Sequence, residues 1–246
     1  MYNSMNFNEK LSDPELRRFA HQISSVQVGI TGQEKLKNIK IAVVGAGGLG
    51  SVILQYFSAI GVGYLGIIDY ALVEESNIQR QVLYGGNDLG KLKAIISKQN
   101  LQNIFPFVNF EIFNIQLNSN NIEKIIGSFD LIVDATNDEF AHTMICNACE
   151  TLNLPWVCGS INEFEGQVAV FDSRKGGGSS QLQFVERSFS CANDNKSGGT
   201  ILSYGFVGNL MAFEVFKFVI GSEESLMNKL LTVNLLSYQI AVKSLI

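Results

Sequence analysis

Four glycines and two basic residues further along the chain have the types and spacing for nucleotide chemistry. The glycines are Gly45, Gly47, Gly48 and Gly50 in the string GAGGLG, which has GxGxxG spacing and directly follows the apolar run Ile39–Val44. Glycines at a strand-to-helix turn permit a tight bend and let the backbone approach a phosphate. The helix that follows offers unpaired N–H groups and the positive end of its dipole. The pattern predicts a site for nucleotide phosphates.

An acidic residue follows at a suitable distance. Asp69 ends the next apolar run, Leu65–Ile68, about 20 residues after the glycines, where an acidic residue that binds a ribose hydroxyl belongs. GxGxxG alone is weak evidence, but strand, turn, helix and acidic residue occur here in the right order. The alternative is a tight turn whose strand-end aspartate faces solvent.

The basic residues Arg80 and Lys93 indicate which nucleotide is bound. A GxxxxGK[ST] phosphate loop is absent, because Ser51-Val52 follows the last glycine. Nucleotidyl transfer needs fixed donors for the charge that develops on phosphate oxygens, whereas a dehydrogenase has little need of two extra cations. Arg can hold two oxygens in a fork and Lys acts as a point charge. The pair favours ATP, although either residue alone would most often be a solvated surface charge.

Several further segments fit one known family. The pattern GxGGLGS…D…SNxQRQ…GKxKA resembles the MoeB/ThiF/HesA family, the bacterial relatives of ubiquitin-activating enzymes. Several motifs in one order are more specific than any one of them. The resemblance covers roughly residues 11 to 245 and includes four other segments: Gly32–Leu36 (GQEKL), Asp130–Thr136 (DLIVDAT), Phe164–Val168 (FEGQV) and Gly208–Lys217.

The resemblance implies an activity and partners. Members of this family are adenylyltransferases that use ATP and Mg²⁺ to attach AMP to the C-terminal glycine of a small ubiquitin-like sulfur-carrier protein, releasing pyrophosphate. The activated carrier then receives sulfur for molybdopterin or thiamine-thiazole synthesis. The resemblance therefore also implies a sulfur-carrier partner and a homodimer.

The resemblance also assigns roles to individual residues. It implies that the glycines form the adenosine–phosphate turn and that Asp69 holds the ribose. Asn77 and Arg80 would contact the phosphates, and Lys93 would stabilise the α-phosphate during attack and departure of pyrophosphate. Arg80 and Lys93 are therefore the expected catalytic residues.

The metal position departs from the family pattern. The family's DxTDN strand end supplies an Asp that binds Mg²⁺, but this chain has Asn137 there, followed by Asp138. Mg²⁺ prefers hard oxygen ligands in octahedral geometry, and an Asn carbonyl brings no negative charge. Either Asp138 takes over the metal, or the metal site is weakened.

His21 is a second departure. The family opens with an RYxRQ-like segment whose second Arg reaches the ATP of the partner subunit, and His21 stands there in Arg18–Gln22 (RFAHQ). Neutral His compensates less phosphate charge than Arg. The enzyme is then slower, or His21 is protonated beside the phosphates, or the role is lost. The alternative is an exposed polar side chain on the first helix.

The four cysteines do not form the paired CxxC zinc site of many family members, so we expect no structural zinc. Cys146 and Cys149 have CxxC spacing within a predicted helix, and with Cys158 they are expected in the core. Cys191 lies in a polar, glycine-ended stretch, where a thiol can act as a nucleophile. A covalent role for Cys191 and a spectator thiol remain open.

Composition describes a soluble protein. The 246 residues are 46% hydrophobic and 17% charged, with a net charge of −5, which argues against a nucleic-acid partner. The sequence shows no secretory signal and no apolar stretch of spanning length, since Glu214 and Lys217 interrupt the most apolar run. We therefore expect a cytoplasmic protein without membrane contacts.

Apolar runs and helical patterns alternate as in an α/β protein with a doubly wound, Rossmann-like and mostly parallel sheet, ending in an antiparallel C-terminal extension. We expect a single ThiF-type adenylation domain over residues 1–246. It consists of a helical arm (1–38), a nucleotide-binding core (39–160), and an antiparallel extension with a crossover loop (161–246). Expected helices include 12–24, Ser51–Ile60, Lys91–Asn103, Phe140–Leu152 and Phe206–Ile220, and one strand, Leu231–Lys243, closes the chain.

Other functions remain open. The departures at Asn137 and His21 permit a catalytically reduced member that binds nucleotide and acts as a partner subunit. A related ATP-dependent enzyme could adenylate another carboxylate, such as that of a peptide, or a modified tRNA base. A NAD-dependent dehydrogenase is the least favoured reading.

Overall fold

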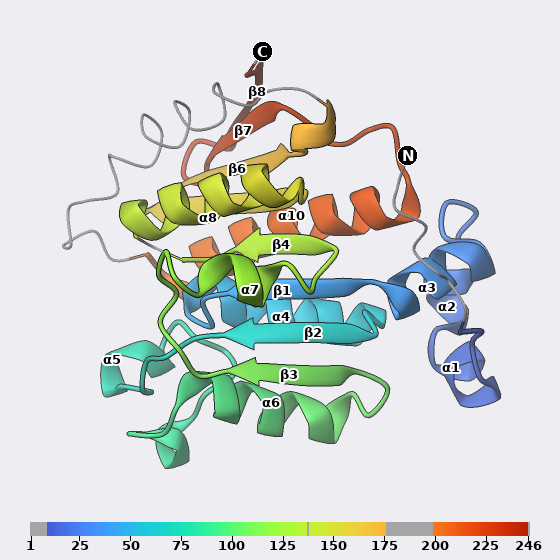
Figure 1. The fold of residues 1–246 in the computed structure, drawn as a ribbon, viewed down its shortest axis with the longest axis horizontal. Coiled ribbons are helices and arrows are strands. Elements are labelled where there is room, and N and C mark those ends of the chain that lie inside the picture. The colour runs from blue at the N-terminus through green and yellow to red at the C-terminus, as the bar shows by residue number, and fades with distance from the viewer. Residues whose placement is uncertain (1–8, 137, 176–198, 246) are drawn as a thin grey trace.

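The structure is a computed structural model that describes residues 9–136, 138–175 and 199–245. These residues build one eight-stranded sheet in the order β3-β2-β1-β4-β5-β6-β7-β8 (Figure 1). The strands from β3 to β5 are parallel, and the strands from β6 onward pair antiparallel. Their bounds are β1 Lys40–Val44, β2 Tyr64–Ile68, β3 Asn109–Phe113, β4 Leu131–Asp134, β5 Trp156–Asn162, β6 Glu165–Phe171, β7 Lys229–Asn234 and β8 Gln239–Ser244.

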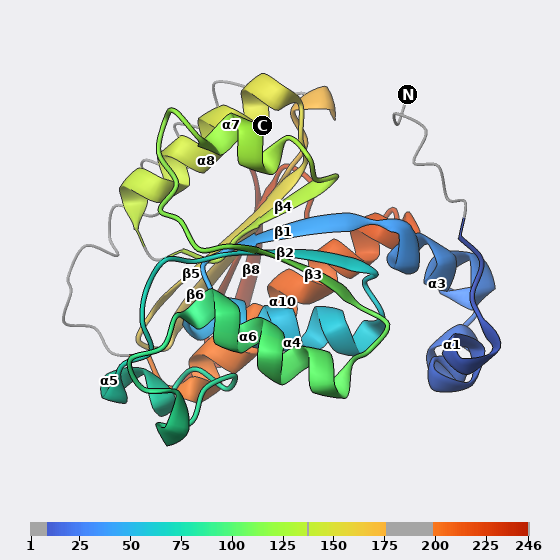
Figure 2. The same cartoon turned by 60° about the horizontal axis from the view of Figure 1, so that its bottom comes forward.

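Helices cover both faces of the parallel strands (Figure 2). One face carries α4, α6 and α10, and the other carries α7 and α8. The doubly wound α/β fold and its antiparallel extension are therefore as predicted. The helix bounds are α1 Asp13–Arg18, α2 Ala20–Ile23, α3 Gly29–Asn38, α4 Gly48–Ile60, α5 Glu75–Ile78, α6 Lys93–Ile104, α7 Ile122–Ile126, α8 Glu139–Leu152 and α10 Ile201–Ile220, with short 3-10 turns at Gly86–Asp88 and Ser173–Lys175.

The position of β1 determines where a ligand can bind. β1 pairs with β2 on one side and with β4 on the other, so the strand order reverses there. In open α/β sheets, ligands bind in the crevice outside the carboxyl ends of the strands at such a reversal. The glycine-rich turn leaves β1 at this crevice.

The core explains why β1 and β4 are continuous apolar runs. Because helices cover both faces, Ile41, Ala42 and Val43 are all fully buried. On the α8 side, Trp156 stacks on Phe171 with ring centroids 4.9 Å apart. Cys146, Cys149 and Cys158 are buried on this side of the sheet, as expected.

α10 is the one described helix that is long and apolar enough to cross a membrane, judged by length and composition. In the fold it packs against α4 and against β5 and β6. Half of its most apolar window is buried in the molecule. α10 is therefore a core helix of this fold.

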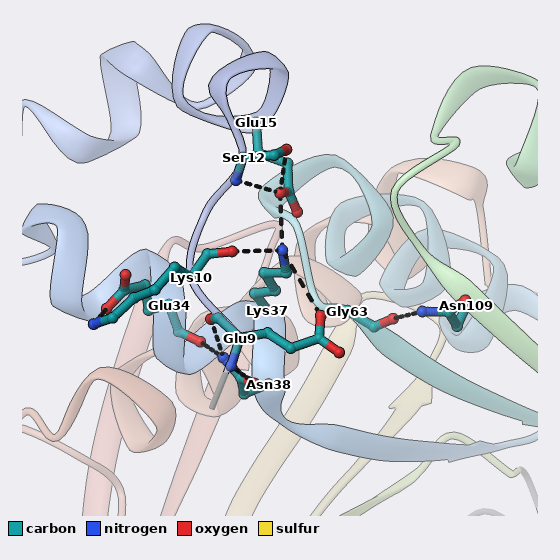
Figure 3. Close-up of polar contacts among 9 residues, drawn as sticks. All are labelled: Glu9, Lys10, Ser12, Glu15, Glu34, Lys37, Asn38, Gly63 and Asn109. Atoms are coloured by element: carbon teal, nitrogen blue, oxygen red, sulfur yellow. Dashed lines mark hydrogen bonds and ion pairs between the residues drawn. The ribbon is translucent and has the colours of Figure 1, made fainter. Parts of the chain in front are cut away.

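The N-terminal arm is attached to the start of the sheet by polar contacts (Figure 3). Lys37 of α3 donates to Glu15 at 2.9 Å and to the Lys10 carbonyl at 2.8 Å. Ser12 and Glu15 form a capping box at the start of α1. Although burial alone would raise the pKa of Glu15, hydrogen bonds from Ser12 and Lys37 lower it below its ordinary value.

Two expected elements differ from the structure. The first helix is interrupted at Phe19, whose φ of −97° and ψ of 13° separate α1 from α2. Where one closing strand was expected, the structure has a hairpin of two strands, β7 and β8. The chain turns between them because Asn234 Oδ1 accepts from the amides of Leu236 and Ser237.

Candidate active site

The glycine-rich turn joins β1 to α4 with little room for side chains. Gly45 has φ +91°, a left-handed conformation, and its amide donates to the Ile68 carbonyl at 2.8 Å. A Cβ on Gly50 would lie 1.8 Å from the Gly45 carbonyl oxygen. Both positions therefore require glycine, because any side chain would strain the turn or separate helix from strand.

The other two glycines face different surroundings. Gly47 precedes α4, and a Cβ there would meet only Gln81 Nε2, at 3.9 Å, so its surface is open to the cavity beside it. Gly48 lies under the ring of Tyr204, 2.6 Å from where its Cβ would be. One glycine thus leaves space for a ligand, and the next is covered by an aromatic side chain.

A cavity of about 960 Å³ opens beside this turn. Its volume suits a ligand of nucleotide size. One wall comes from the glycine turn, the end of β2 and the segment around Arg80, and the other comes from the end of β4 and from α8. The residues that line it include Gly45, Gly47, Gly48, Asp69, Arg80, Gln81, Thr136, Asp138 and Tyr204.

Asp69 shapes the turn through both carboxylate oxygens. Oδ2 accepts from the Ala46 amide and Oδ1 from the Ala71 amide, each at 2.7 Å. The carboxylate therefore lies against the glycine turn at the end of β2, as a ribose-binding residue would. Each oxygen retains a further lone pair for a ligand hydroxyl.

Arg80 is held by an aromatic residue. Its Nη1 donates to the Tyr204 hydroxyl at 2.8 Å, and its guanidinium carbon lies 5.5 Å from the centroid of that ring. Among the described residues, no carboxylate lies within ion-pair distance of Arg80. The guanidinium charge therefore faces the cavity without a counter-ion from this part of the chain.

Lys93 begins α6 and is 8% exposed. Burial lowers the pKa of its ammonium group, and the charge of Arg80 lowers it further, while Asp69 and Glu74 act in the opposite direction. The structure thus places Lys93 in one charge cluster with Asp69 and Arg80, although it does not line the cavity.

Asn77 is buried away from the cavity wall. Its Oδ1 accepts from the Glu74 amide at 3.2 Å and its Nδ2 donates to Ser76 at 3.3 Å, so it caps α5. The segment that carries Arg80 follows directly. Asn77 therefore holds this segment, and in this arrangement its side chain does not reach the cavity.

The opposite wall carries acidic groups. Asp138 is exposed at the cavity and caps α8, with Oδ1 accepting from the amides of Phe140 and Ala141 at 2.8 and 3.2 Å. Asn137 lies outside the described residues. Among the described residues, Asp138 Oδ2 accepts no hydrogen bond, so this oxygen is free to bind a ligand at the cavity.

Sequence reasoning missed a buried pair behind this wall. Asp134, fully buried, forms a 2.6 Å hydrogen bond with His142 Nδ1, and its Oδ1 accepts from the Thr136 amide and hydroxyl. Burial alone would lower the pKa of His142, but the charge of Asp134 and this hydrogen bond raise it above the ordinary value. The pair holds Thr136 at the cavity wall.

Gln81 is a second residue that sequence reasoning left without a role. It is 3% exposed, lines the cavity, and its Oε1 has no hydrogen-bond partner among the described residues. A buried polar atom without a partner is costly unless a ligand or water satisfies it. The sequence offered one indication that Gln81 belongs to the site, because Gln81 directly follows Arg80 in the SNIQRQ run.

Two predicted site residues remain, His21 and Cys191, and His21 does not line the cavity. His21 is exposed on α2, and Figure 1 shows this helix at the end of the sheet where the parallel strands begin, away from the glycine turn. Cys191 lies outside the described residues. In the described chain, no group of three or more His, Cys, Asp or Glu residues is arranged to hold a metal ion.

Comparison with solved structures supports the fold. A crystal structure of PaaA matches all of this chain and 78% of its own, with a TM-score of 0.81 and 23% identity. MccB of E. coli, crystallised with ATP, has a TM-score of 0.80 and 20% identity, covering 98% of this chain and 75% of its own. At these identities the likeness concerns the fold alone.

Curated relatives are closer in sequence. A "Sulfur carrier protein adenylyltransferase" of Thermus thermophilus is 43% identical over 157 residues, covering 64% of this chain and 58% of its own. A "Probable molybdopterin-synthase adenylyltransferase" of Porphyra purpurea is 36% identical, covering 94% of this chain and 62% of its own. This chain therefore spans about 60% of the length of these relatives. Residues 19–245 match the ThiF family, and the chain belongs to that family.

Proposed function

We propose that this protein uses ATP to adenylate the C-terminal glycine carboxylate of a small ubiquitin-like sulfur-carrier protein. The observation that carries the proposal is the cavity wall where the glycine turn, Asp69 and Arg80 meet. Membership of the ThiF family, and relatives named as adenylyltransferases, favour this reaction over other nucleotide chemistry. In it, a carboxylate oxygen of the carrier attacks the α-phosphorus, and the bond to the bridging oxygen breaks to release pyrophosphate.

The residues on this wall suit ATP. Gly47 leaves space beside the turn, and the unpaired Oε1 of Gln81 can accept from a ribose hydroxyl or bound water. We assign Asp69 to the ribose and Arg80 to the polyphosphate, because Arg80 has no carboxylate partner in the described chain. Lys93 is assigned to the α-phosphate, where it stabilises the charge that develops during attack. Asn77 holds the segment that presents Arg80.

Asp138 is the proposed Mg²⁺ ligand. Mg²⁺ is commonly held by one or two carboxylates together with substrate phosphates and water, so a single exposed carboxylate at the cavity fits. Only Oδ1 of Asp138 is used for capping α8. When bound, Mg²⁺ neutralises phosphate charge and orients the leaving pyrophosphate.

We also propose a cytoplasmic homodimer. His21 belongs to α2, and Figure 1 shows α2 at the end of the sheet where the parallel strands begin, so His21 would approach a nucleotide at the glycine turn only from a second copy. The described cysteines are buried thiols, which suits a reducing compartment, and burial raises the pKa of the Cys149 and Cys158 thiols. Such thiols are poor zinc ligands. A covalent role for Cys191 stays a hypothesis.

A catalytically reduced partner subunit is the second candidate function. It is favoured by the use of Asp138 as the N-cap of α8, which leaves one oxygen for a metal. Such a protein would bind ATP at the same wall without transferring AMP. The two candidates differ in one measurable reaction.

That reaction is ATP–pyrophosphate exchange. The test uses purified small carriers that end in Gly-Gly, with matched carriers lacking the two terminal glycines as controls. Exchange that requires Mg²⁺ and the intact carrier terminus supports adenylation of a sulfur carrier. ATP binding without exchange on any carrier supports the partner subunit, and exchange only with a free peptide or a tRNA shows a different substrate.

A further inference from the structure

Tyr204 connects the start of α10 to the glycine-rich turn. It lies in the first turn of α10, where its amide donates to the Thr200 carbonyl at 3.2 Å. The Thr200 hydroxyl caps this turn by accepting from the Ser203 amide at 3.3 Å. Tyr204 is 8% exposed, and it nevertheless lines the cavity. The cap of α10 therefore places a buried tyrosine at the ligand site.

The ring and the hydroxyl of Tyr204 have separate contacts. The ring lies against the glycine turn, where it leaves no space for a Cβ on Gly48. The hydroxyl accepts from Arg80 Nη1 at 2.8 Å, and the guanidinium lies over the ring with 5.5 Å between its carbon and the ring centroid. A single side chain thus contacts both the turn and the cation assigned to the phosphates.

The chemistry of this partner matters for Arg80. A carboxylate in the same place would neutralise the guanidinium and compete with a phosphate for it. A neutral hydroxyl takes up one of the five N–H donors and leaves both the charge and the other donors for a ligand. The aromatic face adds a cation–π contact that restricts the guanidinium without neutralising it. Tyr204 therefore fixes the direction of Arg80 and preserves its charge.

We propose that Tyr204 is a positioning residue that holds Arg80 in the orientation needed to bind the polyphosphate of ATP. This inference rests on the proposed function for the role of Arg80. The inference can be tested separately from the proposed function, because it concerns ATP affinity as well as turnover. A tyrosine that merely filled the core would influence the protein through packing, whether or not Arg80 is present.

A double-mutant cycle separates these possibilities. Tyr204→Phe removes only the hydroxyl, and Arg80→Ala removes its donor. We expect Tyr204→Phe to weaken ATP binding about threefold to tenfold, the effect of one hydrogen bond, and to change adenosine binding by less than about twofold. In the Arg80→Ala background the same substitution has no further effect, because the hydroxyl then has no guanidinium to hold. Isothermal titration calorimetry measures each affinity.

Controls keep the result independent of folding and of turnover. Tyr56→Phe removes the hydroxyl of an exposed tyrosine on α4 and should leave ATP binding unchanged. Thermal unfolding of each variant checks the fold. The proposal is overturned if Tyr204→Phe binds ATP normally, or weakens ATP equally with and without Arg80, or weakens adenosine as much as ATP. Wild-type protein that binds ATP without pyrophosphate exchange refutes the proposed function alone, whereas failure to bind ATP refutes both.

Discussion

The two walls of the cavity differ in how their charged groups are held. On the wall of the glycine turn, Arg80 contacts the neutral Tyr204, and Lys93 is buried beside it. On the wall of β4 and α8, Asp134 is bonded to His142 and Asp138 caps a helix. The first wall keeps the charge of Arg80 available for an anionic ligand, whereas the second uses most of its charge to hold its own shape. Substitutions should therefore lower activity on the first wall and stability on the second.

The largest expected effect is on stability, at His142. His142→Ala leaves the carboxylate of Asp134 buried without its partner, and breaking such a pair costs about 3 kcal/mol or more. Urea unfolding measures this loss. His21→Ala removes an exposed histidine and is the matched control, with an expected change within about 0.5 kcal/mol. Equal stabilities of the two variants would show that the second wall does not depend on this pair.

The second largest expected effect is on the rate of ATP–pyrophosphate exchange, through Lys93 and Arg80. Lys93→Ala and Arg80→Ala should each lower ATP–pyrophosphate exchange at least about a hundredfold, or roughly 2.7 kcal/mol of transition-state stabilisation. Lys91→Ala is the matched control, because Lys91 lies in the same segment but is more than half exposed. Unchanged exchange in either of the first two variants would remove that residue from the mechanism.

Substitution of Asp138 tests whether the second wall also contributes to the reaction. Asn is as good an N-cap as Asp, so Asp138→Asn should leave stability unchanged. If Asp138 binds Mg²⁺, exchange at limiting Mg²⁺ falls by roughly tenfold, because a charged ligand is lost. Adding Asn137→Asp to this variant moves the carboxylate back by one residue and should restore exchange. Full activity of Asp138→Asn at all Mg²⁺ concentrations would contradict the assignment.

The smallest effect concerns the N-terminal arm, which lies outside both walls and is a reference for them. The pKa of Glu15 is lowered in the fold, so its pair with Lys37 adds stability above the ordinary value of 4.5, and this is lost as the pH falls through the lowered pKa. Its contribution should be below about 1 kcal/mol. Glu15→Gln should make the acid side of the stability profile flatter, without a change in ATP affinity. A wild-type profile that is flat below pH 4.5 would contradict this.

Local sequence patterns predicted much of the first wall. Gly45, Gly50 and Asp69 could be placed because strand, turn and helix follow one another in the chain, and the turn itself requires glycine. The sequence also singled out Arg80 and Lys93, whose charges influence one another in the fold, and their roles in the reaction stay predictions. The predicted phosphate contact of Asn77 stays a prediction, because in this structure its side chain caps α5.

Partners that are distant in sequence could not be predicted. Tyr204 and Arg80 are separated by 124 positions, and only the packing of α10 on α4 brings them together. The closing hairpin was also missed. An apolar segment with one polar turn can fold back as a hairpin or continue as one long strand, and the pairing of β7 with β6 decides between these two structures. Hydrophobic periodicity contains no information on such choices.

By itself, the sequence determined the alternating α/β order, the glycine turn and the residue types beside that turn, because these depend on neighbours within one strand–turn–helix unit. Tertiary structure alone decided that Arg80 meets a neutral tyrosine, that Asp134 is satisfied by His142, and that α2, the helix of His21, lies away from the glycine turn. The physical reason is that the charge and freedom of a side chain depend on what packs against it. That partner comes from another element, whose position is set by burial of the whole core.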